Sequence, residues 1–185
     1  EGTRDGFGQG LLRAAEEDDR ITVLCADLSE STRTHLFRDR FPERFVEIGV
    51  SEQSLASIAA GMALEGRIPF IASYAAFSPG RNWEQIRTTV ALQKVPVKII
   101  GAHAGVSVGP DGATHQMTED IALMRVLPQM YVVVPCDAIE AEKATIHLAQ
   151  DDTHPGYLRL TREASPTITT SKAPFEFGKI LPLRK

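Results

Sequence analysis

The chain has 185 residues, enough for one α/β domain with a substantial hydrophobic core. Hydrophobic residues make up 43% of it and charged residues 24%, which excludes the disordered and fibrous classes. The formal net charge of −4 excludes a broadly basic surface, so we expect no nucleic acid among its partners.

Short apolar runs alternate with longer amphipathic segments along the chain, and apolar side chains recur at helical spacing in the longer ones. In chain order we predict a helix over 7–17, strands over 21–26 and 46–49, a helix over 52–65, a strand over 69–74, a helix over 82–94, a strand over 97–101, a helix over 117–126, a strand over 131–135, a helix over 138–149 and a strand over 156–160.

The predicted strands are continuously apolar, which is typical of strands that are buried on both faces. We therefore predict an α/β fold, a three-layer sandwich with a mainly parallel sheet of about six strands covered by helices on both faces. Ligands of such sheets bind beyond the carboxyl ends of the strands. The residues that follow each strand are therefore the candidates for function, namely 27–31, 52, 74–83, 103–115 and 162.

The amino-acid composition of the chain changes near its end. Residues 163–174 are polar, contain prolines and lack periodicity, which is the composition of a linker. Residues 175–181 begin a new apolar pattern that predicts a further strand. We expect one domain over 1–163 and, over 164–185, a linker and the start of a truncated second domain.

Two cysteines, Cys25 and Cys136, each lie within an apolar segment and lack CxxC spacing. This pattern predicts buried free thiols in a reducing cytoplasm, and it argues against a disulfide framework or a cysteine-based metal site. No apolar run has the length of a bilayer span, and the first ten residues are polar. We therefore expect a cytoplasmic protein without a membrane partner.

Four short motifs stand at the predicted strand ends. They are CADLSES at 25–31, IGVSEQ at 48–53, GPDGATHQ at 109–116 followed by Glu119, and LRLTR at 158–162. Each alone is weak, but four in order on a matching pattern of strands and helices form a specific signature. Together they resemble the transketolase family, and the resemblance covers nearly the whole chain.

The resemblance implies a pyrimidine-binding domain that encloses thiamine diphosphate together with a pyrophosphate-binding domain. It further implies a transketolase of the pentose phosphate pathway, which transfers a two-carbon ketol unit between sugar phosphates. Glu52 matches the family's key acid. Its carboxyl group would bind the pyrimidine ring nitrogen and favour the imino form of the cofactor's amino group, the base that forms the C2 ylid. Without the resemblance, Glu52 would be an ordinary acidic residue at the positive end of a helix.

Aromatic residues stack on the aminopyrimidine in this family, and Phe77, Tyr74 and Trp83 are the matching residues. The spacing from Phe77 to Trp83 is one residue longer than in the family, and an ordinary core role is the alternative for each. Asp27, after the first predicted strand, is the remaining residue that the resemblance assigns to the cofactor.

The resemblance places His103 and His115 in the substrate channel, where imidazoles donate to a developing oxyanion and move protons. Asp111 matches a position for a substrate hydroxyl, with an Asp-Gly turn as the alternative. The distal phosphate of the sugar is expected at Arg4, Ser31 and Arg162. Arginine suits a phosphate because its planar fork bonds two oxygens, whereas surface salt bridges and a helix cap are the alternatives for these three residues.

The family anchors the diphosphate through Mg²⁺ with a Gly-Asp-Gly run and an asparagine, and this chain has no Gly-Asp-Gly run. The resemblance therefore implies that the Mg²⁺ ligands lie on a pyrophosphate-binding partner subunit and that this chain holds no metal itself. It resembles the C-terminal subunit of a split transketolase, for which we expect a homodimer or a heterotetramer.

Three other classes remain as alternatives. The enzyme 1-deoxy-D-xylulose-5-phosphate synthase shares the Asp-Gly-x-Thr-His-Gln loop and the Glu52-Gln53 pair, but Glu119, three residues after Gln116, favours a transketolase. The β-subunit of the decarboxylating component of 2-oxoacid dehydrogenases lacks this histidine loop. A non-catalytic binding or scaffold module of the same fold should have lost Glu52 or the histidine loop, and both are present.

Overall fold

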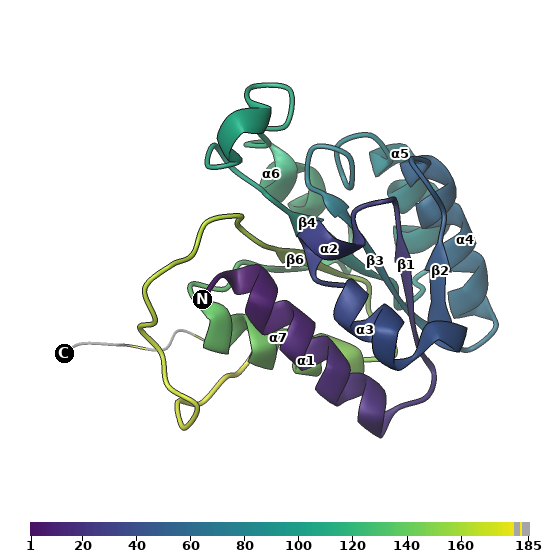
Figure 1. Cartoon of the computed structure of the whole chain (residues 1–185). Coiled ribbons are helices and arrows are strands. Elements are labelled where there is room, and N and C mark those ends of the chain that lie inside the picture. The colour runs from purple at the N-terminus through teal and green to yellow at the C-terminus, as the bar shows by residue number, and fades with distance from the viewer. Residues whose placement is uncertain (180–181, 183–185) are drawn as a thin grey trace.

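The computed structural model describes residues 1–179 and 182, and it shows a six-stranded sheet in which every pairing is parallel (Figure 1). The strands follow the order β2-β1-β3-β4-β6-β5. Their bounds are β1 Ile21–Cys25, β2 Phe45–Glu47, β3 Ile68–Tyr74, β4 Lys98–Ala102, β5 Tyr131–Val133 and β6 Gly156–Arg159. The predicted α/β sandwich is confirmed.

The helices fall between the strands, as the alternating pattern predicts. They are α1 Thr3–Glu17, α2 Ser29–Thr32, α3 His35–Arg40, α4 Glu52–Leu64, α5 Trp83–Gln85, α6 Asp120–Arg125 and α7 Ala138–Gln150. Short 3₁₀ turns cover Pro42–Arg44 and Gly109–Asp111. The helix expected over 82–94 is not uniform, because α5 passes into a π-helical segment over Ile86–Ala91.

Each face of the sheet carries its own hydrophobic core, because neighbouring residues of a strand point to opposite faces. Val23 of β1 packs in the core beneath α1, α3 and α7, whereas the next residue, Leu24, packs in the core beneath α4, α6 and the π-helical segment. Both residues are fully buried. The continuous apolar strands of the sequence thus reflect a sheet covered on both sides.

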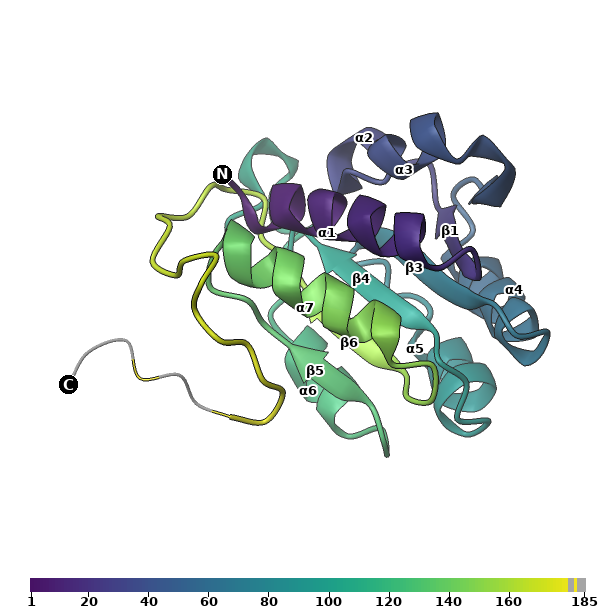
Figure 2. The same cartoon turned by 90° about the horizontal axis from the view of Figure 1, so that it is seen from below.

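Helices α1 and α7 lie side by side on one face of the sheet (Figure 2). They approach closely at Gly6, where a Cβ atom would stand 1.9 Å from the carbonyl oxygen of Ala138. Only glycine allows the two backbones to meet at this point, so its entropic cost within a helix is offset by packing. This contact anchors the N-terminal helix, which carries Arg4, against the rest of the domain.

The segment after β6 packs along α7. Asp137, which caps α7, accepts hydrogen bonds from the backbone N–H groups of Ile168 (2.9 Å) and Thr169 (2.7 Å). The ring of Phe177 stacks on His147 with centroids 4.2 Å apart. The strand expected over 175–181 is wrong for residues 175–179, which form turns and irregular backbone, and its last two residues lie outside the described part. The division at residue 163 stays a prediction.

The two cysteines differ in their surroundings. Cys25 is a buried free thiol, as predicted, whereas Cys136 is exposed and the prediction of burial is wrong for it. The apolar run that contains Cys136 ends as a strand at Val133, so the cysteine stands in the following turn. Among the described residues, no helix is both long and apolar enough to cross a membrane.

Candidate functional site

Glu52 is a deeply buried acid near the carboxyl ends of the strands that carry the predicted site. It is the first residue of α4, where the helix dipole favours a negative charge. Its side chain is 1% exposed, and its Oε2 atom accepts a hydrogen bond of 2.7 Å from Nη1 of Arg81. Asn82 holds the same turn by donating its Nδ2–H to the backbone oxygen of Glu52 at 2.8 Å. The carboxyl group is therefore both buried and held in position.

An aromatic group stands at the ends of β3 and β4. Tyr74 is the last residue of β3 and pairs in register with Ala102, so the next residue, His103, comes to lie beside Tyr74. The two rings stack with centroids 4.0 Å apart. Phe77 lies close to Tyr74, at 6.2 Å between centroids, with the two rings nearly parallel. Tyr74, Phe77 and His103 thus form a cluster of rings beyond the end of the sheet.

His115 joins this group because its loop folds back onto itself. Gly105 and Met117 form an antiparallel bridge, with N···O distances of 2.7 and 3.1 Å, which closes the loop between β4 and α6 (Figure 1). The His115 ring then meets Phe77 edge-on at 5.2 Å, and its Nδ1 lies 2.8 Å from Oγ1 of Thr114. Two histidines twelve residues apart therefore flank the same aromatic side chains.

His103 is 2% exposed, adopts a left-handed backbone conformation with φ of +56°, and its Nδ1 has no hydrogen-bond partner within the described chain. A positive φ in a residue other than glycine marks a constrained position. Burial lowers the pKa of His103 to about 4, and the nearby guanidinium groups of Arg4 and Arg162 add to this effect. Its imidazole is therefore neutral at physiological pH and is available to donate or accept through Nδ1.

We predict that His103 makes the fold sensitive to acid. Its pKa of about 4 lies below the ordinary value of 6.5, so the unfolded chain binds more protons between these pH values. The contribution of His103 to the free energy of unfolding is fully present above about pH 6.5 and falls as the pH decreases, by about 2–3 kcal/mol between pH 7.5 and 4.5. Urea unfolding at both pH values should show this loss in the wild type and a smaller loss in His103→Gln.

The matched control is His35→Gln, which changes a histidine outside this group of rings. It should keep the wild-type dependence on pH. If His103→Gln loses as much stability between pH 7.5 and 4.5 as the wild type does, protonation of His103 is not the cause.

Three arginines gather beside the N-terminus of α1. Arg4 and Arg162 line one pocket of about 240 Å³, and Nη1 of Arg4 donates to the backbone oxygen of Ser31 at 3.1 Å. Burial and the neighbouring Arg33 lower the pKa of Arg4. The Arg162 side chain passes close to Gly109, whose φ is +79° and where a Cβ atom would stand 2.0 Å from Nη1 of Arg162. The predicted phosphate residues Arg4, Ser31 and Arg162 thus come together, with Ser31 contributing its backbone.

The remaining predicted residues are distributed differently. Asp111 lies near enough to His103 that its charge opposes the lowering of the His103 pKa. Asp27 is exposed, and its backbone N–H donates to Glu47 at 2.8 Å. The structure does not bring Trp83 into the aromatic group, because its indole N–H donates to the backbone oxygen of Leu123 at 2.8 Å and its ring lines a separate groove beside Leu92.

A buried polar network that the sequence analysis did not identify joins the start of α6, which follows the histidine loop in the chain, to β6. Oδ2 of Asp120, at the start of α6, accepts hydrogen bonds from the Tyr157 hydroxyl (2.7 Å) and from Nε of Arg159 (2.8 Å). Asp120 and Tyr157 are fully buried. Burial and the Asp120 charge raise the pKa of Tyr157, so its hydroxyl remains a donor. The alternation of Tyr157 and Arg159 along β6 was the available signal, but their partner lies in another element.

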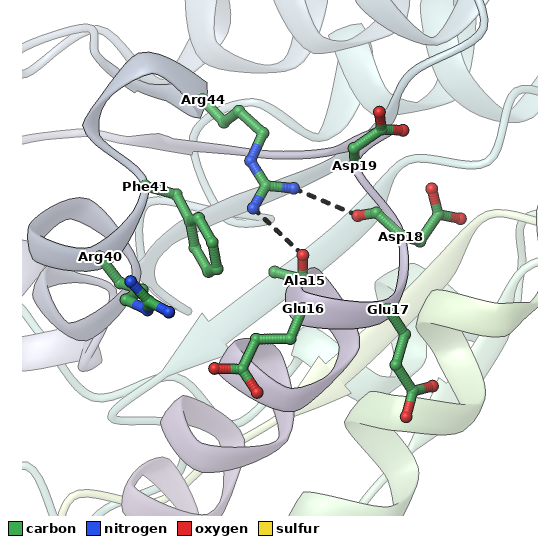
Figure 3. A pocket seen from close by; sticks show the side chains of 8 residues that line it. All are labelled: Ala15, Glu16, Glu17, Asp18, Asp19, Arg40, Phe41 and Arg44. Atoms are coloured by element: carbon green, nitrogen blue, oxygen red, sulfur yellow. Dashed lines mark hydrogen bonds between the residues drawn. The ribbon is translucent and has the colours of Figure 1, made fainter.

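A second pocket, of about 580 Å³, opens near the amino end of β1, where α1 ends (Figure 3). Arg44 donates to the backbone oxygens of Ala15 (3.1 Å) and Asp18 (3.2 Å), and its guanidinium lies 4.0 Å from the centre of the Phe41 ring. These contacts cap the end of α1 and engage both terminal nitrogens of Arg44. Within the described residues, no three His, Cys, Asp or Glu side chains gather as a metal site there or elsewhere.

A buried carboxyl group lies at a helix N-terminus beyond the ends of a parallel sheet, and aromatic rings, histidines and arginines cluster at the same edge. These are the features of a cofactor-binding α/β domain. The sequence matches the family described as "Transketolase, pyrimidine binding domain" over residues 2–167. The chain belongs to this family, whose members use thiamine diphosphate.

Several proteins of this family are similar over most of the chain. A protein of Methanocaldococcus jannaschii, described as a transketolase C-terminal section, is 44% identical over 180 residues, 96% of this chain and 57% of that protein. A solved structure titled "Split gene transketolase, inactive beta4 tetramer" is 40% identical, with a TM-score of 0.88 over 100% of this chain and 59% of the other. The chain thus spans less than two thirds of either protein.

The chain is also similar to the alternative enzyme of the sequence analysis, 1-deoxy-D-xylulose-5-phosphate synthase. A 1-deoxy-D-xylulose-5-phosphate synthase of Nitratidesulfovibrio vulgaris is 40% identical over 140 residues, which are 76% of this chain and 22% of that enzyme. The similarity to this synthase therefore covers less of the chain than the similarity to the transketolase section, which reaches 96%.

Proposed function

We propose that this chain supplies the pyrimidine-binding half of the active site of a thiamine-diphosphate-dependent transketolase, which transfers a two-carbon ketol unit between sugar phosphates. The observation that carries this proposal is the buried carboxyl group of Glu52, which Arg81 links to the Phe77 ring and hence to the rings of Tyr74 and His115 that lie beside it. A scaffold module would have no reason to keep a buried acid next to an aromatic surface.

The residues present fit the aminopyrimidine end of the cofactor. Phe77 and Tyr74 offer ring surfaces for stacking, and Glu52 offers a buried carboxyl group that can share a proton with a ring nitrogen. Thiamine diphosphate supplies an acidic carbon, C2, whose proton must leave before any carbon–carbon bond is made or broken. Glu52 would hold the ring and share a proton with it, while His103 and His115 would bind and orient the substrate oxygens. Asp27 keeps its predicted cofactor contact as part of this proposal, whereas Trp83 does not, because its ring lines a separate groove.

The arginine pocket suits the phosphate end of the substrate. Arg4 and Arg162 carry fixed positive charges that face one pocket, and both lie close enough to His103 to lower its pKa. Charge-assisted hydrogen bonds from two guanidinium groups would select a phosphorylated sugar. Asp111, in the same short turn as Gly109, would accept a hydrogen bond from a sugar hydroxyl.

A partner subunit would complete the site. The solved relative is titled as a split-gene transketolase whose β4 tetramer is inactive. We propose that the present chain is likewise inactive alone and that a pyrophosphate-binding subunit carries the diphosphate and Mg²⁺ ligands. Assembly as a homodimer or a heterotetramer and a cytoplasmic location stay predictions.

We predict that Arg162→Ala weakens the use of phosphorylated sugars specifically. The complete enzyme, assembled from this chain and its partner, should transfer ketol units from a ketose phosphate to an aldose phosphate. Because Arg162 would bond the phosphate, the variant should raise KM for the phosphorylated acceptor by about 10–100-fold, and kcat should change little.

An unphosphorylated aldose serves as the control, and its kinetics should be the same in both forms. Equal losses with both acceptors would show that Arg162 supports the fold and does not bind phosphate. Formation of 1-deoxy-D-xylulose 5-phosphate, with no ketol transfer, would favour the synthase, which the partial similarity keeps as the alternative.

A further inference from the structure

Arg81 contacts both of the features on which the cofactor site depends. Its Nη1 donates to Oε2 of Glu52 at 2.7 Å, and its guanidinium carbon lies 4.6 Å from the centre of the Phe77 ring. It is the only partner of the Glu52 carboxyl group within the described part of the chain. One side chain therefore satisfies the buried acid and covers the aromatic surface beside it.

A guanidinium group and an aminopyrimidine ring have the same two requirements here. Each is planar and delocalised, so each stacks on an aromatic face. Each also presents an N–H group, or a protonated ring nitrogen, in its own plane to a carboxylate. In the chain alone, the place that the proposed function assigns to the aminopyrimidine is thus filled by a side chain of similar shape and chemistry.

The two partners of this ion pair differ in how far their side chains are exposed to solvent. The side chain of Glu52 is 1% exposed, whereas that of Arg81 is 47% exposed. A buried carboxylate without a partner would destabilise the fold, so the pair stabilises the unoccupied chain. Arg81 can turn into solvent at small cost once another donor reaches Glu52, because long charged side chains at the surface are readily hydrated.

We propose that Arg81 is a placeholder for the aminopyrimidine, which pairs with Glu52 and covers Phe77 in the unoccupied chain and is displaced when the cofactor binds. The inference rests on the proposed function, because it takes Glu52 and Phe77 as the cofactor's binding groups. It adds a residue that sets cofactor affinity through competition. Arg81 is a positioning residue in this scheme, since it acts through Glu52.

The test compares cofactor binding in the complete enzyme, without using activity. Thiamine diphosphate with Mg²⁺ is titrated calorimetrically into the wild type, Arg81→Met and Arg81→Lys. Because Arg81→Met removes the competitor, we expect its Kd to be about tenfold lower than that of the wild type. Arg81→Lys keeps the charge without the planar fork, so its Kd should fall between the two.

The matched control is Arg87→Met. Arg87 is an exposed arginine in the adjacent π-helical segment, and it lines a different groove. This variant should leave the Kd unchanged. The melting temperature of the unoccupied protein provides a second measurement, since Arg81→Met should lower it by leaving Glu52 unpaired, and saturating cofactor should remove the difference.

The possible results separate the two claims. Binding by the wild type together with unchanged or weaker binding by Arg81→Met would show that Arg81 does not compete with the cofactor, and would overturn the inference alone. Absence of cofactor binding in the assembled wild type would overturn the proposed function, and the placeholder role with it.

Discussion

Replacement of Glu52 by glutamine is expected to slow hydrogen–deuterium exchange at C2 of bound thiamine by about 10²–10⁴-fold, the usual contribution of a positioned acid or base. This corresponds to about 3–5 kcal/mol of barrier. Glutamine keeps the size of the side chain and can still accept a hydrogen bond from Arg81. It has no ionisable group, so it cannot share a proton with the pyrimidine ring.

The fold should change little in this variant. The half-exposed Arg81 can remain hydrated, and the charge at the helix terminus contributes only about 0.3–1 kcal/mol. The matched control is Glu65→Gln, at the exposed C-terminal end of the same helix, which should leave exchange unchanged. A normal exchange rate together with a lowered melting temperature in Glu52→Gln would make Glu52 a structural residue and would remove its catalytic role.

The second large effect is expected at Asp120, in the buried network behind the histidine loop. Asp120→Ala removes the acceptor of both the Tyr157 hydroxyl and the Arg159 guanidinium. The arginine, whose side chain is 17% exposed, then remains largely buried without its partner. Breaking a buried ion pair on one side costs about 3–5 kcal/mol, so the free energy of unfolding in urea should fall by that amount.

The neighbouring residue provides the control for this network. Glu119 is exposed, and its carboxylate bonds only the adjacent Thr118 in the described structure. Glu119→Ala should therefore change the free energy of unfolding by no more than about 0.5 kcal/mol. A loss below about 1 kcal/mol in Asp120→Ala would mean that water or a rearranged side chain replaces the carboxylate, and that α6 does not depend on this network.

Several features of the site could be predicted because the ligand-binding residues of a parallel sheet lie just after the carboxyl ends of its strands. Tyr74 and His103 stand directly at the ends of β3 and β4, and Arg162 follows β6 by three residues. The apolar runs predict these strand ends to within one or two residues. Glu52 was found by its motif, and its position at the start of α4 agrees with that motif. The local pattern therefore indicated which residues face the site.

Pairings between elements could not be predicted in the same way. The stacking of Tyr74 on His103 requires β3 and β4 to be neighbours in register, and the contact of Arg81 with Glu52 joins residues 29 positions apart. The partners of Lys98 illustrate the same point. This lysine is fully buried and donates to the backbone oxygens of Asp151 and His154, each at 2.6 Å, which no local pattern indicates.

The sequence by itself determined the class of fold, the order of strands and helices along the chain, and the motifs that carry the resemblance to the family. Hydrophobic periodicity and short motifs are local properties, so they can be recognised in the sequence alone. Only the tertiary structure decided that Trp83 turns toward α6, that Cys136 is exposed and that Arg81 covers Phe77. These outcomes depend on contacts between residues that are distant in the sequence, and packing between elements decides which of these contacts form.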